Sequence, residues 1–104
     1  AVIPNLNAKH NYGKTPLICA ACGGHTIVMK FLIDSGSNIN AADDAGKTPL
    51  IYAYSYGHIE AIKLLLNEGA NAVVRDSSDN SILSMARNDG NKEILELLEK
   101  YCIK

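Results

Sequence analysis

Apolar residues along this chain come in short helical clusters that glycines and polar residues separate. The clearest sets are Ile27, Val28, Phe31 and Leu32, and then Ile59, Ile62, Leu65 and Leu66. Spacings of one, three and four residues place each set on one face of an α-helix. The pattern around the second set predicts helices over residues 49–56 and 59–68, with that set facing inward.

Residues that start and stop helices flank these clusters. Thr15 is a good N-cap, and Pro16 suits the first helical turn, where its missing N–H costs no hydrogen bond. A glycine pair after residue 22 breaks the first helix, and Gly36 ends the second as a C-terminal cap. Gly13 stands where the preceding loop requires a left-handed backbone, which glycine adopts without steric cost.

The whole pattern recurs every 33 residues. The run Gly-Lys-Thr-Pro-Leu at 13–17 returns at 46–50, and a weaker copy, Asp-Asn-Ser-Ile-Leu, occupies 79–83. Gly-His follows at 24–25 and 57–58, and Gly-Asn at 90–91. A fixed period of this length predicts a solenoid, in which each repeat buries its apolar face on its neighbour.

The repeated residues resemble the ankyrin repeat: Thr-Pro-Leu, then Ala20-Ala21 or Ala53, then Gly-His, then Leu-Leu-x-x-Gly-Ala-Asn at 65–71. The match covers about residues 5 to 104 in three copies. The resemblance implies an all-α solenoid of stacked helix-turn-helix units whose β-hairpin loops project to one side.

The register divides the chain, as a single domain over 1–104, into three repeats. Residues 1–9 end a preceding repeat or hairpin, and repeats follow at 10–42, 43–75 and 76–104. No helix pair precedes the first repeat, so we expect the chain to be a fragment or its first face to be covered. The last repeat has the features of a C-terminal cap, where we expect the solenoid to end.

Two repeats depart from the family pattern. Tyr54 replaces a residue that is usually Ala, which predicts either a wider gap between repeats or a ring pushed to the surface. Asp79 stands in the place of Gly, and an Asp holds a left-handed backbone less easily. The last repeat also carries charges on its expected outer side, while apolar residues still form an inner side: Arg87, Lys92, Glu93, Glu96 and Glu99, against Ile94, Leu95, Leu97 and Leu98.

Composition narrows the function classes. The net charge is −1 with ten Lys plus Arg and no basic run, which disfavours nucleic acid and anionic lipid as partners. Apolar stretches are interrupted every few residues, so no membrane insertion is expected. Three Cys and no signal-peptide pattern favour reduced thiols in a cytoplasmic or otherwise intracellular setting, with the nucleus also compatible.

No recognisable catalytic, cofactor or metal pattern is present. Cys19 and Cys22 form a C-x-x-C spacing, but no βαβ pattern surrounds it, so we interpret both as helix residues. His25 and His58 are 33 residues apart and are expected to open the second helix of each repeat and bond to a neighbouring loop. Cys102 has no partner at metal-ligand spacing. The sequence therefore predicts a protein that is not an enzyme and holds no cofactor.

The resemblance implies that a partner binds the loop tips and the exposed side of the first helices, which together form a concave face. Tyr12 and Tyr56 are the strongest candidates, because Tyr offers a large contact area and a polar handle at little entropic cost. The alternative is that each ring only covers its neighbour. Arg75 is the tip residue suited to bind a carboxylate. The remaining candidates are Asn11, Lys14, Cys22, Gly23, Asp44, Ala45, Lys47, Ser55, Ser77, Ser78, Asn80, Asn88 and Asp89.

These patterns predict a non-catalytic protein-interaction module with an unidentified protein partner. Two alternatives stay open: a scaffold part of a larger multidomain enzyme, channel or effector, and a module that associates with itself through its N-terminal end. Asn7 and Asn40 also occupy the loop position that asparaginyl hydroxylases modify in some eukaryotic ankyrin proteins.

Overall fold

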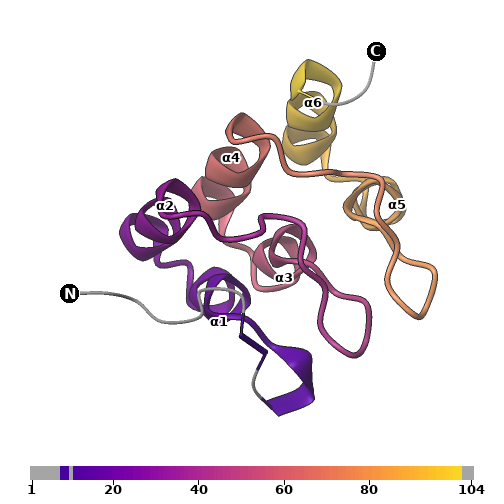
Figure 1. Cartoon of the computed structure of the whole chain (residues 1–104). Coiled ribbons are helices and arrows are strands. Elements are labelled where there is room, and N and C mark those ends of the chain that lie inside the picture. Colours follow the sequence, from indigo (N-terminus) through magenta and orange to yellow (C-terminus); the bar gives the residue numbers. More distant parts are fainter. Residues whose placement is uncertain (1–7, 10, 102–104) are drawn as a thin grey trace.

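The computed structural model describes residues 8–9 and 11–101, apart from the side chain of Asn11. Within them, six α-helices form three antiparallel pairs that stack into a body of 42 × 25 × 22 Å. The helices α1, α3 and α5 make one row (Figure 1). The helices α2, α4 and α6 make a second row beside it, on the side away from the projecting loops. Their bounds are α1 Pro16–Gly23, α2 Thr26–Asp34, α3 Pro49–Ser55, α4 Ile59–Asn67, α5 Ile82–Asp89 and α6 Lys92–Tyr101, with a 3₁₀ turn, η1, at Asn11–Gly13.

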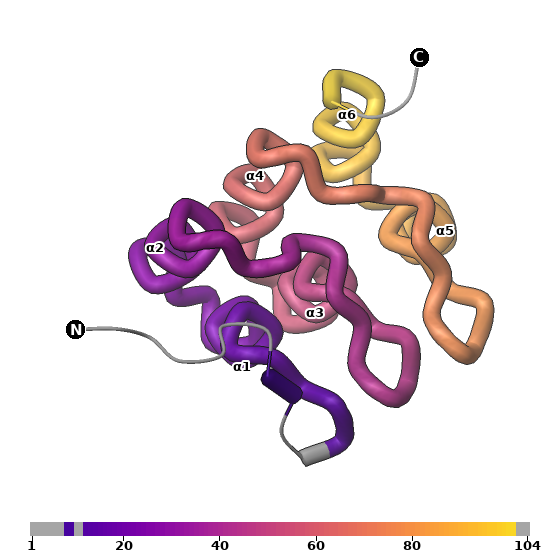
Figure 2. Tube along the Cα trace, viewed as in Figure 1, coloured from indigo at the N-terminus to yellow at the C-terminus, as the bar shows by residue number. Residues whose placement is uncertain are grey.

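The loops before α1, α3 and α5 project to the same side of the stack (Figure 2). Two of them are closed by two backbone hydrogen bonds each. These run from Asp43 N to Lys47 O and from Gly46 N to Asp43 O in the second loop, and from Asp76 N to Asn80 O and from Asp79 N to Asp76 O in the third. The predicted hairpin tips are therefore present, but none of the described residues is assigned to a β-strand. The bonds within each tip close a single tight turn and do not continue into a ladder.

Neighbouring tips are also joined to each other through the backbone. Asp44 N donates to Tyr12 O at 2.9 Å, and Ser77 N donates to Ala45 O at 2.8 Å. These bonds repeat at the 33-residue period and set the spacing between successive loops.

The helix starts confirm the predicted caps. The side chains of Thr15, Thr48 and Ser81 each accept a hydrogen bond from a backbone N–H three residues further on, at 3.1 to 3.3 Å. Pro16 occupies the first turn of α1 as predicted. In the third repeat, where Ile82 replaces Pro, Ser81 and Ser84 form a reciprocal capping box instead.

The core runs through all three pairs as one cluster. Ile62, Leu65 and Leu66 of α4 are buried as predicted, whereas Ile59 is half-buried. Small residues lie where α1 and α3 meet, and Ala21 and Ala53 are fully buried there. Close packing of this kind gives a rigid stack.

The helix α2 was predicted correctly as a helix, but most of its apolar set is exposed. Leu32 is buried, but Ile27, Val28 and Phe31 are 86%, 50% and 54% exposed, and Met29 takes the inner position instead. Periodicity identified an apolar helix surface but not which side has a neighbour. In the next repeat the residues in the same register as Val28 and Phe31 are less exposed: Ala61 is buried and Leu64 is half-buried. The helix α4 packs on both α2 and α6, whereas α2 packs on α4 and on no other described helix of its row.

The last pair matches its predicted pattern. Ile94 and Leu98 are fully buried, and Leu95 and Leu97 are half-buried. The outer surface is polar, with Arg87, Lys92, Glu93, Glu96 and Glu99 all exposed. The helix α6 therefore has one apolar side, against α4 and α5, and one charged side.

The third tip has a strained residue at its turn. Asp79 has φ 65°, matching Gly13 at 78° and Gly46 at 76° in the same register, so the predicted left-handed Asp is confirmed. We expect Asp79→Gly to raise the free energy of unfolding by about 1 kcal/mol, because glycine removes the steric cost of this conformation. Urea unfolding of the two chains measures the change. Ser78→Gly is the matched control: its backbone is not left-handed, so the added flexibility should lower stability. A loss of stability in Asp79→Gly would contradict the prediction.

Candidate functional site

The predicted partner-binding residues lie on one side of the stack, which we call the tip side: residues 11–14, 44–47 and 75–80 together with α1, α3 and α5 (Figure 1). The structure divides them into two groups. One surrounds Tyr52 near the first two tips, and the other lines a groove between α3 and α5. The side chain of Asn11 lies outside the described residues, as do His10, Asn7 and Cys102.

The first group, the tyrosine–lysine cluster, consists of Tyr12, Lys14, Lys47, Tyr52 and Tyr56. The ammonium groups of Lys14 and Lys47 lie 5.4 and 5.7 Å from the centre of the Tyr52 ring, within cation–π range. The Tyr52 and Tyr56 rings stack with centroids 6.4 Å apart and 14° between their planes. Beside them, Tyr12, Lys14 and Tyr52 line a shallow pocket of about 410 Å³.

Tyr52 was not among the predicted site residues, although it holds the cluster together. It lies four residues before Tyr56, so both rings share one face of the same helical turn. That spacing was a usable signal, but the crowding of three tyrosines within residues 52–56 did not show which of them matters most. Tyr52 is half-buried, whereas Tyr12 and Tyr56 are 79% and 60% exposed.

Buried Asp43 fixes the second tip below this cluster. Its carboxylate accepts hydrogen bonds from the N–H groups of Ala45 and Lys47, both at 2.9 Å, and from the Tyr52 hydroxyl. Burial alone would raise the pKa of Asp43, but these hydrogen bonds outweigh it and hold the pKa below its usual value. Burial and the bond to Asp43 raise the pKa of Tyr52, which therefore stays a donor.

The exposed ring of Tyr12 is held in an uncommon backbone conformation. Tyr12 has φ 62° and ψ 22°, in the left-handed region, and Gly13 follows at φ 78°. In the other two tips the equivalent residues, Ala45 and Ser78, are not left-handed. Non-glycine residues rarely adopt this conformation, and those that do often lie at binding sites.

Contacts of His58 link Tyr56 to the first repeat. The rings of Tyr56 and His58 lie 6.4 Å apart, and Nε2 of His58 is 3.0 Å from the carbonyl oxygen of Cys22. His58 thus bonds the neighbouring repeat as predicted, but the acceptor is the last turn of α1 and not a loop, and the bond ties α4 to α1. His25 precedes α2 as its N-cap but makes no side-chain capping bond.

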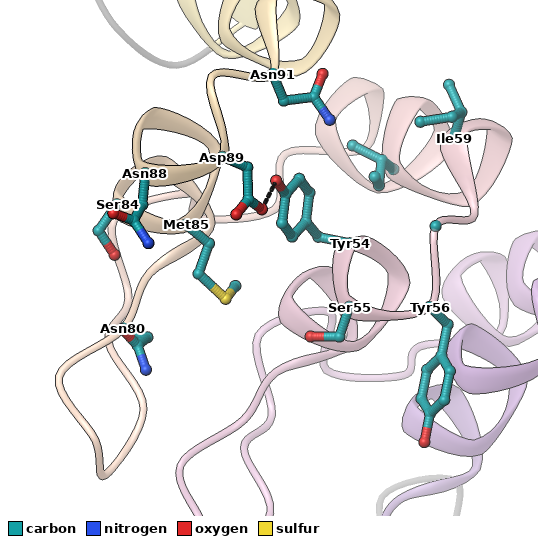
Figure 3. Close-up of a pocket in the computed structure, with 12 residues that line it drawn as sticks. Tyr54, Ser55, Tyr56, Ile59, Asn80, Ser84, Met85, Asn88, Asp89 and Asn91 are labelled. Atoms are coloured by element: carbon teal, nitrogen blue, oxygen red, sulfur yellow. Dashed lines mark hydrogen bonds between the residues drawn. The ribbon is translucent and has the colours of Figure 1, made fainter.

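The second group lines the α3–α5 groove, an open pocket of about 950 Å³. It contains the predicted residues Ser55, Asn80, Asn88 and Asp89, with Tyr56 at its edge. Figure 3 shows Tyr54 pointing across the groove toward Asp89 while Tyr56 points away from it. The other lining residues, which were not among the predicted partner-binding residues, are Tyr54, Gly57, Ile59, Ile62, Ser84, Met85 and Asn91.

Tyr54 is the reason for the groove. In the first repeat the same register holds fully buried Ala21, and α1 packs closely on α3. Between α3 and α5 the half-buried Tyr54 ring stands in this space, and the two helices touch much less. The first of the two predicted outcomes, a wider gap, is therefore what the structure shows. Burial and the hydrogen bond to Asp89 raise the pKa of Tyr54.

In the third tip, Arg75 and Asp76 form contacts with other residues of the same loop. Nη1 of Arg75 donates to Asp79 O at 2.9 Å, and its Nε lies 3.7 Å from the Asp79 carboxylate. Arg75 remains exposed. Asp76, like Asp43, accepts hydrogen bonds from two N–H groups of its own loop.

Residues with catalytic chemistry do not converge in the described part of the chain. It holds no group of three or more His, Cys, Asp or Glu placed to bind a metal ion. Burial raises the pKa of the Cys22 thiol and Lys14 offsets only part of this, the opposite of an activated redox cysteine. The same residues include no helix long and apolar enough to cross a bilayer.

Comparison with protein families agrees with the stack. The family model "Ankyrin repeats" matches residues 2–76 in three copies. The match stops where the third tip begins and where the departures at Asp79 and Ile82 follow. No curated protein matches the chain.

The hydrogen bonds to Asp43 generate a pH-dependent prediction. We expect Asp43→Asn to lower the free energy of unfolding by about 1–2 kcal/mol near neutral pH, because a buried charge-assisted acceptor is lost. The pKa of Asp43 is lower in the folded chain, so this stabilisation is complete above the unfolded value, 3.8, and is lost as pH falls through the folded value. Urea unfolding at a series of pH values should show the two chains converging in acid.

Asp44→Asn is the control, because Asp44 is exposed and accepts none of these bonds. A cost of Asp43→Asn that stays constant into strong acid, or an equal cost for Asp44→Asn, would show that the carboxylate charge is not what holds the tip.

Proposed function

The chain belongs to the ankyrin-repeat family, and from that premise we propose that it is a non-catalytic protein-interaction domain. Ankyrin repeats in general serve as protein-binding modules. The partner surface in this proposal is the tip side, with the tyrosine–lysine cluster at its centre. The proposed partner is a folded protein or peptide and not a nucleic acid, because the chain carries a net charge of −1 without a basic run.

The observation that carries the proposal is the exposure of two tyrosines on a rigid base. Tyr12 and Tyr56 present most of their rings to solvent, while Tyr52, Asp43 and two lysines fix the structure beneath them. Exposed aromatic side chains contribute most to affinity when they lose little conformational entropy on binding. That fixed base argues against the alternative in which each ring only covers its neighbour.

The proposal also covers the division of the chain into repeats and its location in the cell. We take 10–42, 43–75 and 76–104 as the three repeats and residues 1–9 as the end of a preceding one. A cytoplasmic or other intracellular location is part of the proposal, because Cys19 and Cys22 are both free thiols.

The double substitution Tyr12→Ala/Tyr56→Ala tests the surface. The wild-type chain and the double variant are used as baits in lysate of the native organism, and retained proteins are compared by mass spectrometry. We expect a protein that the wild type retains and the variant loses, since each central tyrosine contributes about tenfold or more to affinity. Circular dichroism should show unchanged helix content.

Tyr101→Ala is the matched control, because Tyr101 is an exposed tyrosine of α6, outside the tip side. It should retain the same protein as the wild type. Equal retention by the double variant would move the binding surface away from the tyrosine–lysine cluster and overturn the proposal.

One observation favours a second candidate, self-association. Ile27, Val28 and Phe31 form an exposed apolar patch on α2, which we call the α2 patch. The opposite end of the stack is charged, with Lys92, Glu93, Glu96 and Glu99 exposed. The α2 patch would therefore pair with the same patch of a second copy, in a two-fold dimer, and not with the charged end.

Sedimentation equilibrium across a wide concentration range tests this candidate. Self-association predicts an average mass that rises toward twice the monomer mass and a Phe31→Glu variant that stays monomeric, because the buried charge would be unpaired. Val73→Glu changes an exposed apolar residue outside the patch and should leave the mass curve unchanged. A wild-type chain that remains monomeric at every concentration would exclude the dimer.

A further inference from the structure

The α3–α5 groove has a distinct chemical character within the tip side. Of the described residues that line it, Asp89 alone is charged. The tyrosine–lysine cluster, at the first two tips, carries the ammonium groups of Lys14 and Lys47 beside the carboxylates of Asp43 and Asp44. The groove therefore differs from the cluster in presenting a single negative charge with no cation among its lining residues.

The Asp89 carboxylate is held in place by the groove wall. Its Oδ2 accepts the hydroxyl hydrogen bond of Tyr54 (Figure 3). Among the described residues no Lys, Arg or His pairs with Asp89, which is exposed at the C-terminal end of α5. The charge is thus oriented by a neutral donor and is not neutralised.

The walls beside this carboxylate are apolar or aromatic. Tyr54 supplies a ring face and Met85 supplies a flexible thioether, and Figure 3 shows both beside the space in front of Asp89. An aromatic face attracts a cation, and these surfaces also accept the alkyl stem of a long side chain. A carboxylate between such walls selects a cation with an apolar stem.

Polar side chains at the rim of the groove can form hydrogen bonds with the peptide groups of a partner. Ser55, Asn80 and Asn88 line it with side chains that both donate and accept hydrogen bonds. At about 950 Å³ the groove is larger than one side chain, so it also holds part of the main chain that carries it.

We propose that the α3–α5 groove binds a lysine or arginine side chain of the partner, with its cation at Asp89 between Tyr54 and Met85. The inference rests on the proposed function and names the chemistry of the partner at this site. The partner's main chain then lies along Ser55, Asn80 and Asn88. A partner segment with an acidic residue there is disfavoured, because its charge would face Asp89.

Short blocked peptides test the groove directly on the full chain. The probes are acetyl-Ala-Ala-X-Ala-Ala-amide with X as lysine, arginine, norleucine or glutamate, titrated into ¹⁵N-labelled protein and followed by amide chemical shifts. We expect the lysine and arginine peptides to shift Ser55, Met85 and Asn88 and to bind about fivefold or more tightly than norleucine, which keeps the stem without the charge. The glutamate peptide should bind most weakly.

Matched variants separate the local charge from the net charge. Asp89→Asn keeps an oxygen that accepts the Tyr54 hydrogen bond and should reduce the lysine peptide to the affinity of norleucine. Glu99→Gln removes one negative charge from the exposed side of α6, outside the tip side, and should leave lysine binding unchanged. Equal affinity of lysine and norleucine, equal losses in the two variants, or the absence of shifts in the groove would each overturn the inference.

The result of the peptide titration is independent of the result of the capture experiment with the tyrosine variants. A partner that is lost from Tyr12→Ala/Tyr56→Ala but still retained by Asp89→Asn would leave the binding function standing and refute the basic side chain. Peptide shifts in the groove, with no dependence of partner capture on the tyrosines, would support the basic-residue site while the proposed function fails.

Discussion

Among the described residues, each helix pair packs only against the pairs next to it, and the rest of the structure depends on that constraint. Polar contacts follow the same neighbour-to-neighbour rule. His58 bonds the Cys22 carbonyl, Asn71 N donates to the Asn40 side chain at 2.8 Å, and the tips are linked through their backbones. Stability in such a stack is a sum of repeats and the contacts between them. A change at one contact therefore alters one junction and leaves the others intact.

The two junctions differ because one residue changes in size. Ala21 lets α1 and α3 approach closely, whereas Tyr54 stands between α3 and α5 and leaves a groove. Tight packing at the first junction gives the tyrosine–lysine cluster a firm base. The looser second junction exposes side chains of Ser55, Met85 and Asn88 that a close-packed junction would cover. The stack thus carries the tyrosine–lysine cluster and the α3–α5 groove next to each other.

Local patterns were sufficient to predict the helices, their caps and the left-handed residues at Gly13 and Asp79, because these depend on a few neighbouring residues. The exposure of the α2 patch was not predicted, since periodicity does not reveal which side of a helix has a neighbour. The site was predicted only as a set of exposed positions. Its division into a cluster and a groove depends on contacts over long sequence separations, such as Tyr54 with Asp89, 35 residues apart. No local pattern contains such a contact.

The links between successive tips have an evolutionary consequence. They join backbone N–H and carbonyl groups, at Asp44 with Tyr12 and at Ser77 with Ala45, so their side chains take no part in holding the tips together. Substitutions at these positions change the chemistry of the surface while the loops keep their spacing. Mutation and selection can therefore redirect such a protein to a new partner in small steps, each of which leaves a folded intermediate.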